Sequence, residues 1–183
     1  MYWFFAHGET KVARRGNDAP RDPEEATVET NLYREGMARL EAGDAAAARA
    51  LLEEALQAAP DSPEVLHGLA RTLDLLGDRD AARAFLERAH ARAPTEPGPA
   101  CDLAMTYLER GEDARARDVL APVVAAHAEH PAANLHFAMA LAKTEPRRAR
   151  EHLARARQGS DAQARQQAEA LDRVLAESAT RRA

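Results

Sequence analysis

Residues 63–96 read PEVLHGLARTLDLLGDRDAARAFLERAHARAPTE, and this stretch decides the fold. Ser62 followed by Pro63 is typical of a helix N-cap and the first helical position. Gly77 suits the positive φ at which a first helix stops, and Asp78 suits the N-cap of a second. Pro94 ends that second helix. The stretch therefore predicts two helices joined by a short turn.

The same features return at a spacing of 34 residues along the chain. The recurring columns are Pro63, Pro97 and Pro131; Gly43, Gly77 and Gly111; Ala48, Ala82 and Ala116; Leu52, Leu86 and Leu120; and Pro60 and Pro94. Self-similarity at a fixed period is the sequence signature of a repeat protein. The sequence therefore predicts a stack of helix pairs.

This pattern resembles the tetratricopeptide repeat (TPR), a helix–turn–helix unit of 34 residues. The unit at 63–96 matches best, with Leu66, Leu69, Ala70, Leu73, Ala82, Leu86, Ala89 and Pro94. The resemblance implies an all-α, right-handed α-solenoid of about four units, at residues 29–62, 63–96, 97–130 and 131–159. In the third unit Pro122 lies inside the expected second helix, so we expect a kink near Asp118 or a late helix start.

Two flanking segments complete the expected organisation. Residues 160–183 form a C-terminal capping helix and tail, because Ser160 and Gln163 have capping-box spacing and one apolar stripe follows. That stripe consists of Ala164, Ala168, Leu171 and Leu175. Residues 1–28 form an aromatic segment and a linker, in which Pro23 with two glutamates suits the opening of the first helix.

The aromatic segment MYWFFA at residues 1–6 holds half of the aromatic residues of the chain. Three interpretations stay open: it packs on the first helix pair as a cap, it inserts into a groove, or it is the remnant of an anchor or a tail. Self-association through Tyr2–Phe5 is a related hypothesis. The segment is too short to span a membrane and no basic run precedes it, so we expect a cytoplasmic protein, or a periplasmic one if an upstream signal or anchor is missing.

Composition and charge restrict the function classes. Roughly a quarter of the residues are alanine, only 4% are aromatic, and the formal net charge is −5. The first two values favour helices, and the net charge argues against a nucleic-acid binder, which would carry a basic patch. Cys101 is the only cysteine, so a disulfide within the chain and a zinc site built on cysteine pairs are both excluded.

The resemblance also implies a concave groove, lined by fixed positions of the first helix of each unit. Transferred position by position, the candidate binding residues are Tyr33, Met37, Leu40, His67, Arg71, Asp74, Cys101, Met105, Leu108, Leu135, Met139 and Lys143. The same positions also hold Glu41, Glu64, Leu75 and Glu109. Three of the four methionines fall in one column, and methionine suits surfaces that accept varied apolar ligands. The alternative is that these apolar residues only pack against the neighbouring helix. The carboxylate clamp known in the family is absent, because Tyr33 and Met37 replace its first lysine and asparagine.

The other polar residues give no sign of catalysis. Arg71 is a candidate anchor for an acidic group, although an internal pair with Asp74 is favoured. His127, His130 and His136 have no further carboxylate at a convincing ligand spacing, and His67 is expected to act as a neutral hydrogen-bonding group. No phosphate-binding loop or nucleophile motif occurs. We therefore expect no catalytic residue, no metal site and no cofactor.

The leading functional hypothesis is a non-catalytic module that binds a peptide or helix of a partner protein, without contacts to nucleic acid or to the interior of a membrane. A secretion-type TPR chaperone is the second hypothesis, because small acidic TPR chaperones of type III secretion are similar in size. The third is an accessory TPR domain that serves an enzyme system.

Overall fold

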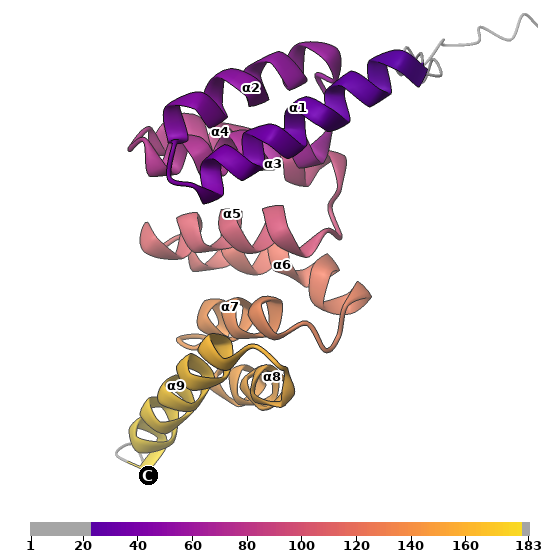
Figure 1. The fold of residues 1–183 in the computed structure, drawn as a ribbon. Helices are drawn as coiled ribbons and strands as arrows, with labels where there is room; N and C mark the ends of the chain where they lie inside the picture. Colours follow the sequence, from indigo (N-terminus) through magenta and orange to yellow (C-terminus); the bar gives the residue numbers. More distant parts are fainter. Residues whose placement is uncertain (1–22, 181–183) are drawn as a thin grey trace, which may run out of the picture.

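The computed structural model describes residues 23–180, and this part of the chain consists of helices without any strand (Figure 1). The helices are α1 (Pro23–Glu41), α2 (Ala45–Ala58), α3 (Pro63–Leu75), α4 (Arg79–Arg92), α5 (Pro97–Glu109), α6 (Asp113–Ala126), α7 (Pro131–Leu141), α8 (Pro146–Gln158) and α9 (Ala162–Thr180). The expected all-α class is confirmed. The first helix begins at the proline that the sequence indicated.

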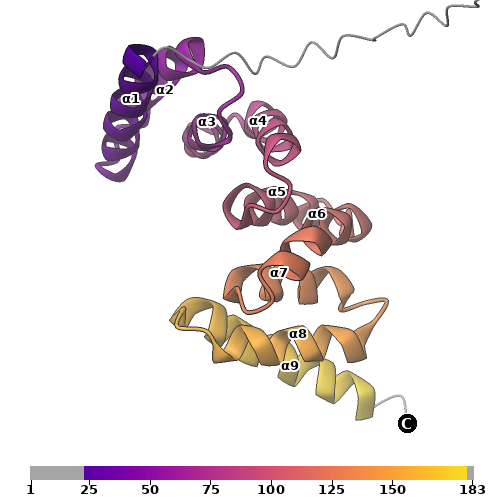
Figure 2. The ribbon, with the colours of Figure 1, turned by 90° about the vertical axis from the view of Figure 1, so that its right-hand side faces the viewer.

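The helices form successive pairs that stack on one another (Figure 1). The stack curves, and α1, α3, α5 and α7 lie on its hollow side while α2, α4 and α6 lie on the other (Figure 2). This arrangement is an α-solenoid, in which each helix pair contacts mainly its neighbours.

The turns between paired helices have the predicted chemistry. Gly43, Gly77 and Gly111 adopt φ values of 82°, 86° and 73°, a region in which a side chain would be strained. Asp44 and Asp78 then cap the next helices, because their carboxylates accept hydrogen bonds from the backbone N–H groups three residues on, at 3.0 and 3.1 Å. Local sequence therefore fixes where the first two pairs turn.

Small residues bring the paired helices close together. The three alanines and three leucines of the repeat columns are all buried in the core. A Cβ atom on Gly36 would lie only 2.8 Å from Cγ of Leu52, so α1 and α2 approach at a point where any side chain would collide. The columns thus act as contact points between helices, as the repeat pattern predicts.

One of the two alternatives for Pro122 and the expected cap of the last helix are both wrong. Helix α6 begins at Asp113 and continues through Pro122, so the expected late start of this helix does not occur. Helix α9 begins at Ala162, and the carboxylate of Asp161 accepts from the N–H groups of Gln163 and Ala164 at 2.9 and 3.1 Å. Asp161, not Ser160, therefore supplies the side-chain cap of α9.

The third unit ends without the proline that closes the first two, because Ala128 stands at that position. A buried polar cluster around Asn134 secures the fourth helix pair there instead. The side-chain amide of Asn134 donates to the carbonyl oxygens of Ala128 and His130 at 2.8 and 3.0 Å. Its Oδ1 lies 2.8 Å from Nδ1 of His152 on α8, and the His152 ring contacts Phe137 edge to face. Asn134 thereby joins the loop before α7 to α8.

Helix α9 covers the last helix pair, as expected of a cap (Figure 1). Ala164, Ala168 and Leu175 are buried against the preceding helices, and Leu171 is half-buried. Asp172 also faces α8, where it accepts from Arg150 at 2.7 Å and from Arg157 at 3.3 Å. The cap therefore combines an apolar stripe with ion pairs that the sequence pattern did not indicate.

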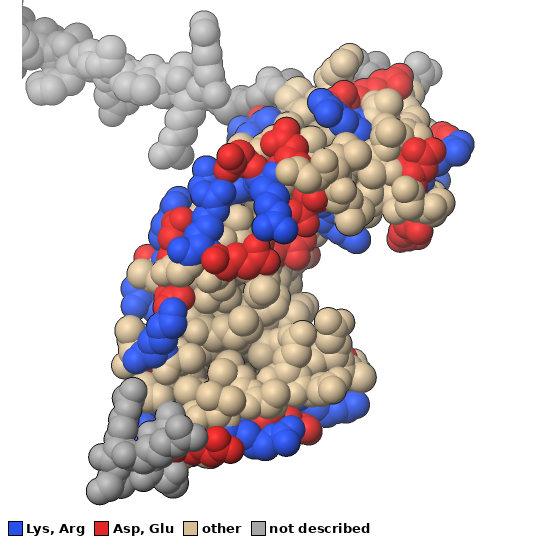
Figure 3. Space-filling model, turned by 90° about the vertical axis from the view of Figure 1, so that its left-hand side faces the viewer, with Lys and Arg blue, Asp and Glu red and all other residues tan. Residues whose placement is uncertain are grey.

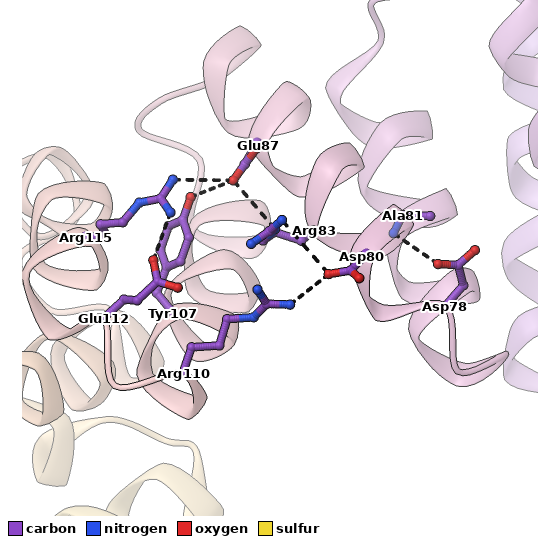
Figure 4. Close-up of polar contacts among 9 residues, drawn as sticks. All are labelled: Asp78, Asp80, Ala81, Arg83, Glu87, Tyr107, Arg110, Glu112 and Arg115. Atoms are coloured by element: carbon purple, nitrogen blue, oxygen red, sulfur yellow. Dashed lines mark hydrogen bonds and ion pairs between the residues drawn. The ribbon is translucent and has the colours of Figure 1, made fainter.

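Polar contacts connect the second and third pairs across their junction (Figure 4). The Tyr107 hydroxyl on α5 donates to Glu87 on α4 at 2.9 Å, and the Arg115 guanidinium lies 4.2 Å from the centre of the Tyr107 ring. Burial and the Glu87 hydrogen bond raise the pKa of Tyr107 to about 12. Arg110 adds an ion pair with Asp80 at 2.8 Å. These contacts fix α4 relative to α5, and so the shape of the hollow side.

No helix within residues 23–180 combines the length and the apolar character needed to cross a membrane.

Candidate peptide-binding groove

Three hollows follow the helices of the concave side from α1 to α5. The hollow between α3, α4 and α5 has a volume of about 300 Å³ and is lined by Ala70, Arg71, Asp74, Leu75, Arg79, Ala82, Leu86, Asp102, Met105, Thr106 and Glu109. A shallow one of about 490 Å³ lies on α1 beside Thr30, Tyr33, Arg34, Met37, Ala38 and Glu41. The third, of about 290 Å³, is lined by Tyr33, Pro63, Glu64, His67, Ala93, Glu96, Gly98 and Pro99.

The hollow side is poor in charge toward the C-terminal repeats. Figure 3 shows an indentation whose lower wall is formed largely by uncharged residues, with acidic and basic side chains along its edges. Such a surface can take apolar side chains of a ligand in its interior and polar ones at its rim.

The three methionines of the groove column are neither fully buried nor fully exposed. Met37, Met105 and Met139 are all half-buried. Met37 Sδ lies 3.2 Å from the position that a Cβ atom on Gly68 would occupy, so Met37 bridges α1 and α3. Met139 packs against the main core cluster, and Met105 lines the hollow between α3 and α5. The methionines therefore contact neighbouring helices and still present surface to a ligand.

Three of the predicted groove residues belong to the core. Leu40, Cys101 and Leu135 are 6%, 6% and 2% exposed. Burial raises the pKa of the Cys101 thiol to about 12, so this cysteine stays a neutral thiol. Leu108 is half-buried against the same core. The apolar part of the accessible groove therefore rests on Tyr33, Leu75 and the methionines.

The polar groove residues are partnered differently from the expectation. His67 Nε2 lies 2.7 Å from the Asp102 carboxylate, so this histidine links α3 to α5. Arg71 and Asp74, both exposed, form no ion pair with each other or with any other residue of the described range, and the favoured pairing is wrong. Lys143 pairs with Asp113 at 2.7 Å. Arg71 is thus left with its charge available to a ligand.

The histidines near the start of α7 have structural surroundings. Nδ1 of His130 accepts from the Ala133 N–H at 3.2 Å and caps α7. Within residues 23–180 no group of three His, Cys, Asp or Glu side chains is arranged to hold a metal ion. Tyr2–Phe5 and the linker before Pro23 lie outside the described residues.

Several residues of the hollows were missed by the sequence analysis. Asp102, Thr106 and Arg79 line the hollow between α3, α4 and α5 but stand outside the groove positions that the repeat pattern gives. Leu75 is 67% exposed, one of the more exposed apolar residues of the chain. Leu75 holds one of the groove positions of the second unit, so the repeat pattern had already indicated it.

A curved stack of helix pairs with a hollow side defines the class of α-solenoid interaction proteins. A family model described as "Tetratricopeptide repeat" matches residues 39–97 and 76–143. The chain belongs to the tetratricopeptide repeat family, whose members are generally non-catalytic scaffolds for protein–protein interaction. The comparison with curated proteins gave no match.

Solved structures share the fold. A thermophilic TPR protein of Thermus thermophilus is 28% identical with a TM-score of 0.64, and the match covers 78% of this chain and 80% of that one. A mutant of the O-GlcNAc transferase of Thermobaculum terrenum is 25% identical with a TM-score of 0.63, over 75% of this chain but only 27% of the transferase. YrrB, described as a TPR protein with an unusual peptide-binding site, is 21% identical with a TM-score of 0.61, over 79% and 75% of the two chains.

Proposed function

We propose that this chain is a non-catalytic binding module that holds a peptide or helix of a partner protein in its concave groove. The observation that carries the proposal is the run of hollows along α1, α3 and α5, with partly exposed methionines between them. Flexible, polarizable methionines adapt to apolar side chains of different shapes. Helix-in-groove recognition uses apolar anchors of this kind.

Removal of the apolar groove surface tests this proposal without a change of charge. In the variant Met37→Gln/Met105→Gln/Met139→Gln, affinity capture from the native cells should lose the proteins that the wild-type chain retains. Val28→Gln/Val174→Gln is the matched control, because both valines are exposed and lie outside the hollows. Circular dichroism on the same preparations checks that the helices persist. Normal capture by a folded methionine variant contradicts groove binding.

A second candidate is an accessory domain of an enzyme system, and one comparison favours it. The matched segment of the O-GlcNAc transferase is a part of a larger enzyme. In this proposal the groove presents a substrate protein to a catalytic partner. Co-purification of an enzyme activity that the methionine variant fails to retain supports it, and capture of partners without such activity speaks for a plain interaction module.

A further inference from the structure

The groove has an apolar interior and a rim with an excess of negative charge. Its hollows are lined by the carboxylates of Glu41, Glu64, Asp74, Glu96, Asp102 and Glu109. Only three guanidinium groups, those of Arg34, Arg71 and Arg79, line the same hollows. A surface of one predominant sign attracts ligands of the other sign and speeds their association.

Half of these carboxylates form no hydrogen bond and no ion pair within residues 23–180. Asp102 is engaged by His67, Glu109 lies 3.9 Å from Arg79, and Glu64 accepts from the Ser62 hydroxyl. Glu41, Asp74 and Glu96, by contrast, make no side-chain hydrogen bond or ion pair within residues 23–180. These three carboxylates are spread over α1, α3 and the start of α5, so they border the part of the groove between α1 and α5. They are free to pair with cations of a ligand.

We propose that the occupant of the groove is a basic amphipathic helix of a partner protein. This inference rests on the proposed function and specifies the chemistry of the partner. Its apolar side chains fill the hollows beside Tyr33, Met37 and Met105, and its lysine or arginine side chains reach the free carboxylates at the rim. A polar, uncharged strand or an acidic tail would leave either the apolar interior or the carboxylates without complement.

Arg71 restricts which residues of the partner helix can face this part of the groove. It is exposed, makes no ion pair within the described range, and lies in the hollow together with Asp74 and Met105. A lysine or arginine directly opposite this guanidinium is repelled, so the residue of the partner helix at that point is neutral or acidic. Acidic and basic groups of the groove therefore act in opposite directions on a uniformly basic ligand.

Two synthetic helical peptides of about 18 residues serve as probes, with the same leucines on one face and either lysines or glutamates on the other. Fluorescence anisotropy with the full chain measures their affinities at about 50 mM and about 300 mM salt. The lysine peptide should bind at least about tenfold more tightly at low salt, and the preference should shrink at high salt.

Three variants separate groove charge from net charge. Glu41→Gln/Asp74→Asn/Glu96→Gln should weaken the lysine peptide about tenfold, since each exposed ion pair contributes a factor of roughly two to five. Glu54→Gln/Glu151→Gln/Glu169→Gln removes the same charge from exposed sites on α2, α8 and α9 and should leave the affinity nearly unchanged. Arg71→Gln should instead strengthen the lysine peptide about twofold to threefold.

The outcomes decide the inference and keep it apart from the proposed function. Equal affinity for the two peptides, tighter binding of the glutamate peptide, no binding of either, or equal effects of the two acidic triple variants overturns the basic helix as the occupant. If both peptides bind equally and both are lost with Met37→Gln/Met105→Gln/Met139→Gln, groove binding stands while the inference fails. Opposite effects of the groove carboxylates and of Arg71 support it.

Discussion

Replacing Asn134 with alanine should destabilise the C-terminal half of the solenoid more than its small volume suggests. Asn134 is fully buried, and its side chain makes three hydrogen bonds, to the carbonyls of Ala128 and His130 and to Nδ1 of His152. Alanine has a higher helix propensity than asparagine, but it can form none of these side-chain hydrogen bonds. The α6–α7 loop and α8 then lose the group that joins them.

The loss of stability depends on whether the groups that were hydrogen-bonded to Asn134 find water or another partner in the variant. Ala128 is exposed, so its carbonyl regains water, and the His130 carbonyl keeps the hydrogen bond from the backbone N–H of residue 134. His152 is only 8% exposed, so its Nδ1 loses a buried partner. A buried polar group without a partner costs about 1–3 kcal/mol, and the free energy of unfolding should fall by about that much.

Urea unfolding followed by circular dichroism measures this loss, and hydrogen exchange shows where it acts. Because helix repeats unfold in parts, amides of α7 and α8 should exchange faster while those of α3 and α4 keep their protection. Asn31→Ala on the exposed surface of α1 is the matched control, expected to change stability by less than about 0.5 kcal/mol. A similarly small effect of Asn134→Ala would refute the role assigned to this cluster.

Three further predictions concern packing and pH. Leu86→Ala should cost about 2–3 kcal/mol, since Leu86 is 5% exposed but borders a hollow; a loss below about 0.5 kcal/mol in urea unfolding would contradict its core position. Gly159→Ala should lower the melting temperature, because its Cβ would lie 2.1 Å from Pro131 Cγ; an unchanged melt excludes this contact. Burial lowers the pKa of His90, His130, His136 and His152 below 6.5. As the pH drops below about 6.5, the unfolded chain therefore takes up protons before the folded one, and the melting temperature should decrease. A melting temperature that stays constant between about pH 7.5 and 5.5 would be inconsistent with this.

Local chemistry made the helix boundaries of the repeats predictable from the sequence. The positive φ of Gly77 and the capping carboxylate of Asp78 follow from residues next to each other in the chain. The start of α9 was misplaced because Ser160 and Asp161 are both good caps, and only the path of the chain selects Asp161. Pro122 did not delay α6, since the tertiary contacts of that helix outweigh one missing hydrogen bond.

The sequence indicated which residues fall at groove positions, but not how far each of their side chains is exposed. Repeat spacing assigned Met105 and Arg71 to one groove, and both line the same hollow. It could not tell that Leu135 is covered by its neighbours, because the overlap of successive pairs depends on the rotation between them. Nor could it show that Arg71 stays unpaired at one helical turn from Asp74, since rotamers decide such exposed contacts.

Site-specific photocross-linking in the native cells tests the concave groove most directly. A photoreactive phenylalanine derivative replaces Met105 in one variant and Ala121, an exposed residue of α6 on the other side of the stack, in a second. Groove binding predicts a cross-linked partner from position 105 and none from position 121. A partner captured only from position 121, or equally from both, would contradict it.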